Sequence, residues 1–281
     1  MTGSRLLGWV RAISYFILTF AIMPVQALAL LFSASLAERI PIFYHGICAR
    51  ILGFRVVVRG TPSQVRPTLF IANHTSYFDI ILLASLIPCS FIAKSEMVSW
   101  PLIGWLAKLQ RSVFVDRRPV NVGEHRTEVA RRLAEGDNLV LFAEGTTSDG
   151  NRLLPFKSSL FSVAENLHAE KPLTIQPVSI VATGLDGMPL GRTLRPLYAW
   201  YGDMPLMPHA WTAIKSGLIT VEIEFHEPLT NAGMNRKQLA EICRAEVELG
   251  FVRSITGRSN TRTVTADADI EENADAVEAA A

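Results

Sequence analysis

The chain has 281 residues, of which 49% are hydrophobic and 19% are charged, and this balance excludes a wholly disordered protein. Its 27 Lys and Arg residues against 26 Asp and Glu residues leave a net charge of +1, without the basic excess of a typical nucleic-acid-binding protein. Three dispersed cysteines, Cys48, Cys89 and Cys243, have the spacing of neither a disulfide framework nor a metal site, so we expect them to be reduced and structural.

The first predicted element is a helix within residues 12–37, a run without any charged residue that follows Arg5 and Arg11. As a helix this run would extend about 39 Å at ~1.5 Å per residue. That length exceeds the roughly 30 Å hydrocarbon core of a bilayer. Pro24 removes a backbone donor in the middle of the run, which leaves a spanning helix and a re-entrant helical hairpin both open. We therefore predict an N-terminal helical membrane anchor.

A cleavable signal peptide is the alternative interpretation of this run, because Ala27 and Ala29 have the spacing of a cleavage site. Apolar residues continue beyond that point through Phe32, where a mature protein would begin with polar residues. The pattern favours permanent attachment.

Residues 41–52 read as a second, amphipathic helix that Gly53 ends, and short apolar runs then alternate with segments of helical periodicity. The expected strands are residues 55–59, 68–72, 90–93, 112–115, 139–143, 174–181 and 220–225. The expected helices between and after them are residues 77–86, 101–109, 122–134, 158–166 and 235–249. This alternation predicts an α/β fold with a mixed, largely parallel sheet flanked by helices.

The predicted organisation is an anchor in residues 1–53, an α/β domain in residues 54–253 and a disordered acidic tail in residues 254–281. All 27 basic residues and 20 of the acidic ones precede Thr265, so residues 1–264 carry +7 and the remainder carries −6. A basic body beside an apolar anchor suits an anionic membrane surface and an acidic carrier protein.

The strand at residues 68–72 runs directly into the sequence Asn-His-Thr-Ser-Tyr-Phe-Asp, residues 73–79, and an apolar helical stretch follows. His74 is therefore expected at the carboxyl end of a strand, where open α/β sheets bind ligands, with Asp79 in the first turns of the next helix. Asp79 can then accept a hydrogen bond from one imidazole nitrogen and leave the other as a general base. The alternative is a histidine that merely caps the turn, with Asp79 favoured near a helix N-terminus.

The spacing from His74 to Asp79 resembles the His-x4-Asp motif of the PlsC-like 1-acylglycerol-3-phosphate acyltransferases, also called lysophospholipid acyltransferases. Further segments in the same order carry the same resemblance: residues 113–117, residues 142–146 with 155–157, and residues 175–178. The similarity extends over about residues 40–230. It implies a glycerolipid acyltransferase-like fold in which residues 54–253 form the acyltransferase domain.

The resemblance implies an enzyme that transfers a fatty acyl group from a thioester of acyl carrier protein or coenzyme A to a lyso-lipid hydroxyl. His74 would take the hydroxyl proton and Asp79 would orient and stabilise the imidazole, in a direct transfer without a covalent acyl-enzyme. The same resemblance implies no cofactor, no metal and no nucleic-acid partner. It implies a lipid membrane as partner and location at a bacterial inner membrane, with the active site facing the cytoplasm.

The family pattern also suggests which residues bind the substrates. Arg117 would hold the polar head of the acceptor, and Asn73, Glu144, Gly145 and Thr146 would complete the substrate-binding set. Gly145 would let the backbone approach the ligand closely, and Glu144 would accept hydrogen bonds from acceptor hydroxyls.

Lys94 follows another expected strand, and it is either a ligand of the donor phosphates or a solvated lysine.

The chain departs from the family pattern after Glu-Gly-Thr, where Thr147 replaces an arginine suited to a phosphate and Asp149 adds an acid. A zwitterionic, phosphate-free acceptor tolerates this loss, and the block resembles the lyso-ornithine lipid O-acyltransferase branch. Lyso-ornithine lipid is therefore the favoured acceptor, and 1-acyl-sn-glycerol-3-phosphate, which would give phosphatidic acid, is the alternative. Arg152 or Arg195 is a possible substitute for the missing charge.

Residues 97–106 are apolar and contain Trp100 and Trp105, which suits either core packing or an interfacial surface. Two further interpretations of the whole chain stay open. One is a non-catalytic lipid-binding membrane protein, and the other is a metal-dependent hydrolase with His74 and Asp79 as ligands.

Overall fold

A mixed β-sheet forms the centre of the molecule, which the computed structural model describes over residues 3–115, 122–165 and 172–257. Within these residues the strands pair in the order β1-β8-β6-β2-β5-β3-β4, and β7 and β9 pair with β6. Their bounds are β1 (Phe54–Arg59), β2 (Thr68–Ala72), β3 (Ser90–Lys94), β4 (Val113–Val115), β5 (Leu139–Phe142), β6 (Thr174–Leu185), β7 (Met188–Pro189), β8 (Ile219–Phe225) and β9 (Leu229–Thr230). Strand β6 is antiparallel to β7, β8 and β9, and the other pairs are parallel. The predicted mixed, largely parallel sheet is confirmed.

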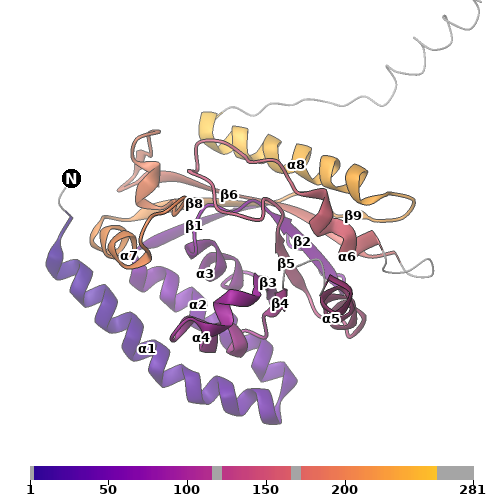
Figure 1. Cartoon of the computed structure of the whole chain (residues 1–281). Helices are drawn as coiled ribbons and strands as arrows, with labels where there is room; N and C mark the ends of the chain where they lie inside the picture. The colour runs from indigo at the N-terminus through magenta and orange to yellow at the C-terminus, as the bar shows by residue number, and fades with distance from the viewer. Residues whose placement is uncertain (1–2, 116–121, 166–171, 258–281) are drawn as a thin grey trace, which may run out of the picture.

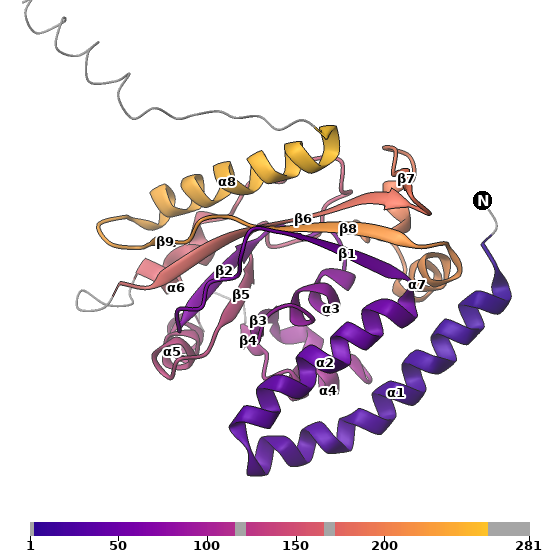
Figure 2. The ribbon, with the colours of Figure 1, turned by 180° about the vertical axis from the view of Figure 1, so that it is seen from behind.

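Helices cover both sides of this sheet (Figures 1 and 2), with α8 along one face and α3 on the other. The α-helices are α1 (Arg5–Phe32), α2 (Ala34–Leu52), α3 (Phe78–Ala84), α4 (Ile103–Leu109), α5 (Val122–Ala134), α6 (Ser162–Glu165), α7 (Leu206–Lys215) and α8 (Arg236–Thr256). The 3₁₀ segments within the described residues are η1 (Ser95–Ser99), η3 (Ser158–Phe161) and η4 (Arg195–Leu197).

The alternation of side chains along β2 divides the core into two layers, because successive residues of a strand point to opposite faces. Phe70 and Ala72 pack in the cluster that holds α3 and the end of α2. Leu69 and Ile71 pack in the cluster that holds residues of α5 and α8. All four side chains are fully buried, so β2 is a central strand whose two ends have fixed positions.

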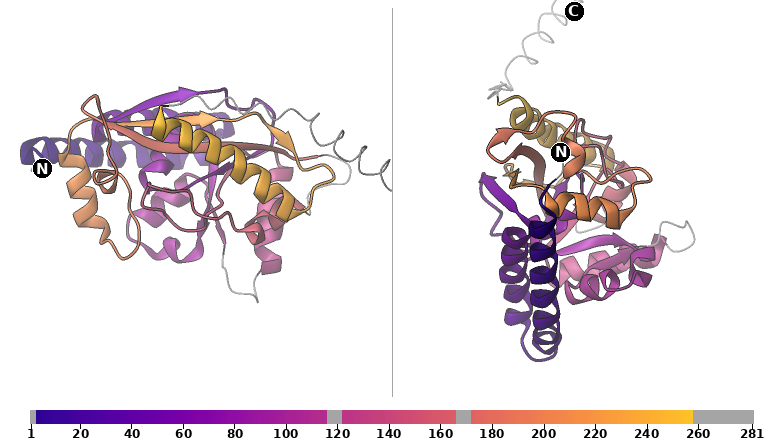
Figure 3. Two further views of the ribbon diagram at one scale, coloured as in Figure 1. Left: turned by 90° about the horizontal axis from the view of Figure 1, so that it is seen from above. Right: turned by 90° about the vertical axis from the view of Figure 1, so that its left-hand side faces the viewer.

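The two N-terminal helices form a hairpin, and they lie side by side along one side of the molecule (Figure 3). Helix α1 continues through Pro24, and the chain reverses at Ser33, whose extended backbone ends α1 and whose hydroxyl caps α2. Between the helices the Thr19 and Tyr44 hydroxyls lie 2.8 Å apart. The break therefore occurs nine residues beyond the proline, and α2 begins well before the expected residue 41.

Arg11 fastens this hairpin to the domain. Its guanidinium Nη1 donates to the main-chain oxygens of Ile214, Ser216 and Gly217 at 3.0, 2.7 and 3.2 Å, at the C-terminal end of α7. A cation is favoured there because helix carbonyls concentrate negative potential at that end. Gly53, which ends α2 with a φ of +85°, leaves the space that the guanidinium occupies.

The hairpin exposes many large apolar side chains. Exposed large side chains on α1 include Trp9, Ile17 and Phe32, and Phe43 continues the surface on α2. Within the described residues α1 is the helix whose length and composition would allow it to cross a membrane. Trp105 and Trp100 of the neighbouring segment are 65% and 39% exposed, which contradicts the core-packing alternative for them.

Some elements differ from the sequence-based expectation. Helix α7 was not predicted, because Pro208 lies within its short apolar stretch, and residues 158–165 form a 3₁₀ turn and a short helix instead of one continuous helix. Residues 258–281, which hold most of the predicted acidic tail, lie outside the described residues. The three cysteines are free.

Candidate active site

The candidate site lies where the neighbouring parallel strands β2 and β5 end. Ala72, the last residue of β2, pairs with Phe142, the last residue of β5. His74 follows β2 by two residues, and the Glu144-Gly145 turn follows β5 by two. Parallel strands bring their carboxyl ends to the same edge, so two motifs seventy residues apart in sequence meet here.

His74 and Asp79 are joined by the predicted hydrogen bond, with 2.8 Å between His74 Nδ1 and Asp79 Oδ2. Asp79 Oδ2 also accepts the backbone N–H groups of Thr75 and Ser76 at 2.7 and 2.9 Å. Because a carboxylate only accepts, the bond makes Nδ1 the donor and assigns the acceptor role to Nε2 of the neutral ring. The His74 side chain is 18% exposed, whereas that of Asp79 is fully buried.

The imidazole is held in its plane by an aromatic stack. The rings of His74 and Phe142 are 3.8 Å apart at their centroids and 14° from parallel, and Phe91 continues the stack behind Phe142 at 6.1 Å. Phe142 thus restricts rotation of the ring that Asp79 orients.

The second oxygen of Asp79 is occupied by a residue that sequence reasoning missed. The Tyr198 hydroxyl donates to Asp79 Oδ1 at 2.5 Å, and Tyr198 is completely buried. It lies 119 residues beyond Asp79, immediately after η4, and no spacing rule connects a 3₁₀ turn of three residues to the motif. Only the fold reveals this contact.

Glu144 faces inward, not toward a ligand. Its Oε2 accepts the N–H of His74 at 2.7 Å and its Oε1 accepts the N–H of Leu154 at 2.6 Å, and the residue is 1% exposed. Burial outweighs these two bonds and, with a smaller contribution from the nearby Asp79, raises the pKa of the Glu144 carboxyl to about 7. Both oxygens serve the backbone, so this geometry does not match the expected contact with an acceptor hydroxyl.

Asn73 is also committed to the fold. Its Nδ2 donates to the carbonyl of Ile180 at 2.9 Å, its Oδ1 accepts the N–H of the same residue at 2.8 Å, and its side chain is fully buried. This two-bond clamp ties the start of the motif to β6 and engages both polar atoms of the side chain, and the contact of Asn73 with substrate stays a prediction.

The remaining predicted substrate-binding residues differ in their exposure, and one of them lies outside the described residues. Gly145 has a φ of +68°, which a side chain would disfavour, and Thr146 is exposed beside it. Arg117 lies outside the described residues. Lys94 is exposed at the end of β3.

A charged loop packs on the motif turn. The Ser148 N–H donates to the carbonyl of His74 at 2.9 Å, and a Cβ at Gly150 would lie 3.1 Å from Thr75 Cγ2 and 3.7 Å from Arg195 Cδ. Arg195 Nη1 donates to Asn151 Oδ1 at 2.8 Å, and its Nε is buried without a hydrogen-bond partner among the described residues. Burial lowers the pKa of Arg195, against the opposing charge of Asp149. A basic and an acidic side chain therefore flank the turn that carries His74.

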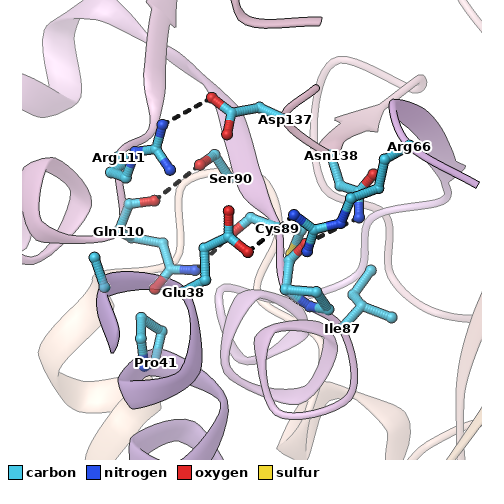
Figure 4. Close-up of a pocket in the computed structure, with 12 residues that line it drawn as sticks. Glu38, Pro41, Arg66, Ile87, Cys89, Ser90, Gln110, Arg111, Asp137 and Asn138 are labelled. Carbon is cyan, nitrogen blue, oxygen red and sulfur yellow. Dashed lines mark hydrogen bonds and ion pairs between the residues drawn. The ribbon is translucent and has the colours of Figure 1, made fainter. Parts of the chain in front are cut away.

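A small pocket of about 20 Å³ lies at the opposite edge of the sheet (Figure 4), where β3 and β5 begin. Its charges are paired, Arg66 with Glu38 at 2.9 Å and Arg111 with Asp137 at 2.9 Å. The Arg66–Glu38 pair joins α2 to the base of the sheet, which indicates a structural role for this edge. Within the part of the chain that the structure describes, no group of three His, Cys, Asp or Glu side chains has the arrangement of a metal site.

Comparison with known proteins agrees with this geometry. The sequence model of the family described as Acyltransferase matches residues 55–181. A lyso-ornithine lipid O-acyltransferase of Brucella abortus is 43% identical over 246 residues, covering 86% of this chain and 92% of that protein. Another of the same name from Rhizobium meliloti is 38% identical over 265 residues, covering 91% of each.

Among solved structures, the crystal structure of the 1-acyl-sn-glycerophosphate acyltransferase PlsC from Thermotoga maritima is similar to this chain. It has a TM-score of 0.63 and covers 90% of this chain and 98% of that protein at 20% identity. At this identity the likeness concerns the fold.

Proposed function

The chain belongs to the acyltransferase family and transfers an acyl group to a lysolipid; on this premise we propose that His74 is its general base and lyso-ornithine lipid its acceptor. The proposed donor is an acyl thioester of acyl carrier protein or coenzyme A. The observation that carries the proposal is the pair of His74 and Asp79 at the strand ends, with Nδ1 donating to a buried carboxylate and Nε2 as the acceptor.

The proposed reaction is a direct transfer. His74 Nε2 takes the proton of the acceptor hydroxyl as its oxygen attacks the thioester carbonyl, and the buried Asp79 stabilises the imidazolium that forms. The carbon–sulfur bond then breaks, and the imidazolium returns the proton to the departing thiolate. The products are an ester and a free thiol, and His74 is neutral again.

The preference for a lyso-ornithine acceptor rests on the residues around the motif turn. Thr147 stands where the family resemblance leads one to expect an arginine, so a phosphate loses one bidentate ligand. Arg195 and Asp149 offer one charge of each sign beside the turn, which suits a zwitterionic head group with a carboxylate and an ammonium. The names of the Brucella abortus and Rhizobium meliloti relatives point the same way.

We also propose that the hairpin of α1 and α2 holds the enzyme on the cytoplasmic face of the inner membrane. The exposed apolar side chains of α1 and the exposed tryptophans near α4 support this attachment, because tryptophan favours the membrane–water boundary. Acyl carrier protein and coenzyme A thioesters are cytoplasmic, so the proposed active site faces that side.

In the decisive experiment, purified protein in mixed micelles is assayed in parallel with two acceptors, lyso-ornithine lipid and lysophosphatidate. Each acceptor is tested with acyl thioesters of acyl carrier protein and of coenzyme A. We expect a higher kcat/KM for lyso-ornithine lipid, with His74→Ala inactive on both acceptors. A strong preference for lysophosphatidate would refute the argument from Thr147 and Arg195, and activity retained in His74→Ala would refute the assignment of the base.

A further inference from the structure

Tyr198 reaches the reacting pair from a part of the chain outside the matched family segment, residues 55–181. Its ring packs between Phe54 and Phe78, with centroids 5.8 and 6.0 Å away, and its backbone N–H donates to the carbonyl of Arg195 at 2.9 Å. These contacts hold the ring in a position from which its hydroxyl donates to Asp79 Oδ1.

The segment that carries Tyr198 is itself tied to the motif turn. The N–H of Trp200 donates to the carbonyl of Thr75 at 2.9 Å, and His209 Nε2 lies 3.2 Å from the carbonyl of Pro196. His209 Nδ1 in turn lies 2.9 Å from the Tyr77 hydroxyl. The position of the Tyr198 hydroxyl is therefore fixed relative to His74 by contacts on both sides of it.

The Asp79 carboxylate needs this hydroxyl because the carboxylate is completely buried. Its Oδ2 receives three hydrogen bonds, from His74 and the Thr75 and Ser76 amides, whereas among the described residues Tyr198 is the donor to Oδ1. A buried, charged oxygen that lacks a hydrogen-bond donor lowers the stability of the folded protein. Without the Tyr198 hydroxyl, the Asp79 carboxylate would rotate, or more of its negative charge would lie on Oδ2, which faces His74.

We propose that Tyr198 is a positioning residue of the transfer reaction, which holds the plane of the Asp79 carboxylate and draws charge from it, and thereby holds the His74 imidazole in the orientation of a base. This inference rests on the proposed role of His74. Tyr198 has no contact with substrate in this scheme and acts through Asp79 alone.

The test is Tyr198→Phe, which keeps the ring packing and removes only the donor. We expect kcat to fall roughly ten- to hundredfold, the range expected from losing a hydrogen bond to a charged group, with KM changed less than about twofold. The bond to Oδ1 also withdraws negative charge from Asp79. Its loss therefore stabilises the His74 imidazolium and moves the acid limb of the kcat profile to higher pH.

Besides His74 and Tyr198, the titratable groups around this pair among the described residues are Glu144, from the turn after β5, which interacts with Asp79, and Tyr77, from the motif turn, which interacts with Tyr198. Both are present in wild type and variant, so the difference between the two pH profiles reports the Tyr198 hydroxyl. Tyr44→Phe is the matched control, because it removes a buried tyrosine hydroxyl that bonds Thr19 in the hairpin, and its kcat and pH profile should equal those of wild type.

Two outcomes overturn the proposal. One is a Tyr198→Phe enzyme with wild-type kcat and pH profile, and the other is a loss of activity that follows only the folded fraction, with the acid limb unmoved. If Tyr198→Phe does not fold, site-specific 3-fluorotyrosine at 198 keeps the ring and strengthens the donor, and the acid limb should move to lower pH. An unmoved limb overturns the inference.

A double variant separates this inference from the proposed function. Adding Tyr198→Phe to His74→Ala should cause no further loss of any residual activity, because the hydroxyl acts through that histidine. A large further loss contradicts the positioning role. If His74→Ala alone stays fully active, the proposed role of His74 is wrong, and this result differs from the one that would overturn only the role of Tyr198.

Discussion

The substitution Glu144→Gln tests whether ionisation of the buried Glu144 carboxyl lowers the free energy of unfolding. Glu144 is 1% exposed, and its two oxygens accept the backbone N–H groups of His74 and Leu154. Glutamine has nearly the same shape, but it cannot ionise, and its NH₂ group cannot accept a hydrogen bond. The variant therefore separates the charge of Glu144 from its packing.

The expected magnitude follows from the pKa of Glu144, raised from the ordinary 4.5 to about 7, chiefly by burial. At about 1.4 kcal/mol per pKa unit, this shift corresponds to about 3 kcal/mol. The folded state holds its proton more tightly than the unfolded chain, so this contribution to stability is fully present below pH 4.5 and is lost as the pH rises through 7. Glutamine lacks that dependence and at every pH forfeits one backbone hydrogen bond, worth roughly 1–3 kcal/mol.

The assay is urea unfolding in a fixed detergent, followed by tryptophan fluorescence at several pH values between 4.5 and 8. Glu144→Gln should be less stable than wild type at the acid end, and the free-energy difference should shift by about 3 kcal/mol in favour of the variant by pH 8, so that the gap closes or reverses. Glu227→Gln at an exposed position is the control and should show a nearly constant difference. A difference for Glu144→Gln that stays constant with pH, or widens as the pH rises, would refute the reasoning.

Four further changes have defined outcomes. His74→Ala should abolish acyl transfer while circular dichroism and vesicle flotation stay as in wild type. Asn73→Ala breaks both bonds to Ile180 and should lower the unfolding free energy by roughly 2–5 kcal/mol in urea titrations. Gly250→Ala would place a Cβ 2.8 Å from the His226 ring and should cost roughly 1–3 kcal/mol, seen as a lower Tm. Arg195→Gln should raise KM for lyso-ornithine lipid with little change in Tm; an unchanged KM would count against its contact with the head group.

The pairing of His74 with Asp79 was predictable because it depends on local geometry. A strand that ends two residues before a histidine, followed by a helix whose first turn holds the aspartate, leaves few other arrangements. The mixed sheet was predictable for the same reason, since its strands are short apolar runs that turn signals separate.

The role of Glu144 was not predictable from its own neighbourhood. Its position after a strand suggests a ligand, but the carboxylate turns inward because the adjacent parallel β2 ends at the same level and presents the His74 amide. Tyr198 and Asn73 act over 119 and 107 residues, and pairing at such separations depends on the order of strands, which periodicity does not report.

Arg11 gives the hairpin of α1 and α2, the proposed membrane anchor, a second role beyond attachment. If a flexible linker alone joined the hairpin to the domain, the domain could take any distance from a bilayer and any tilt relative to it. The three hydrogen bonds from Arg11 to the end of α7 instead fasten the two parts together. In a membrane, the depth to which the hairpin inserts would then determine the distance of His74 from the lipid surface. Replacing residues 1–53 with a generic spanning helix would keep the enzyme on the membrane yet lose that alignment.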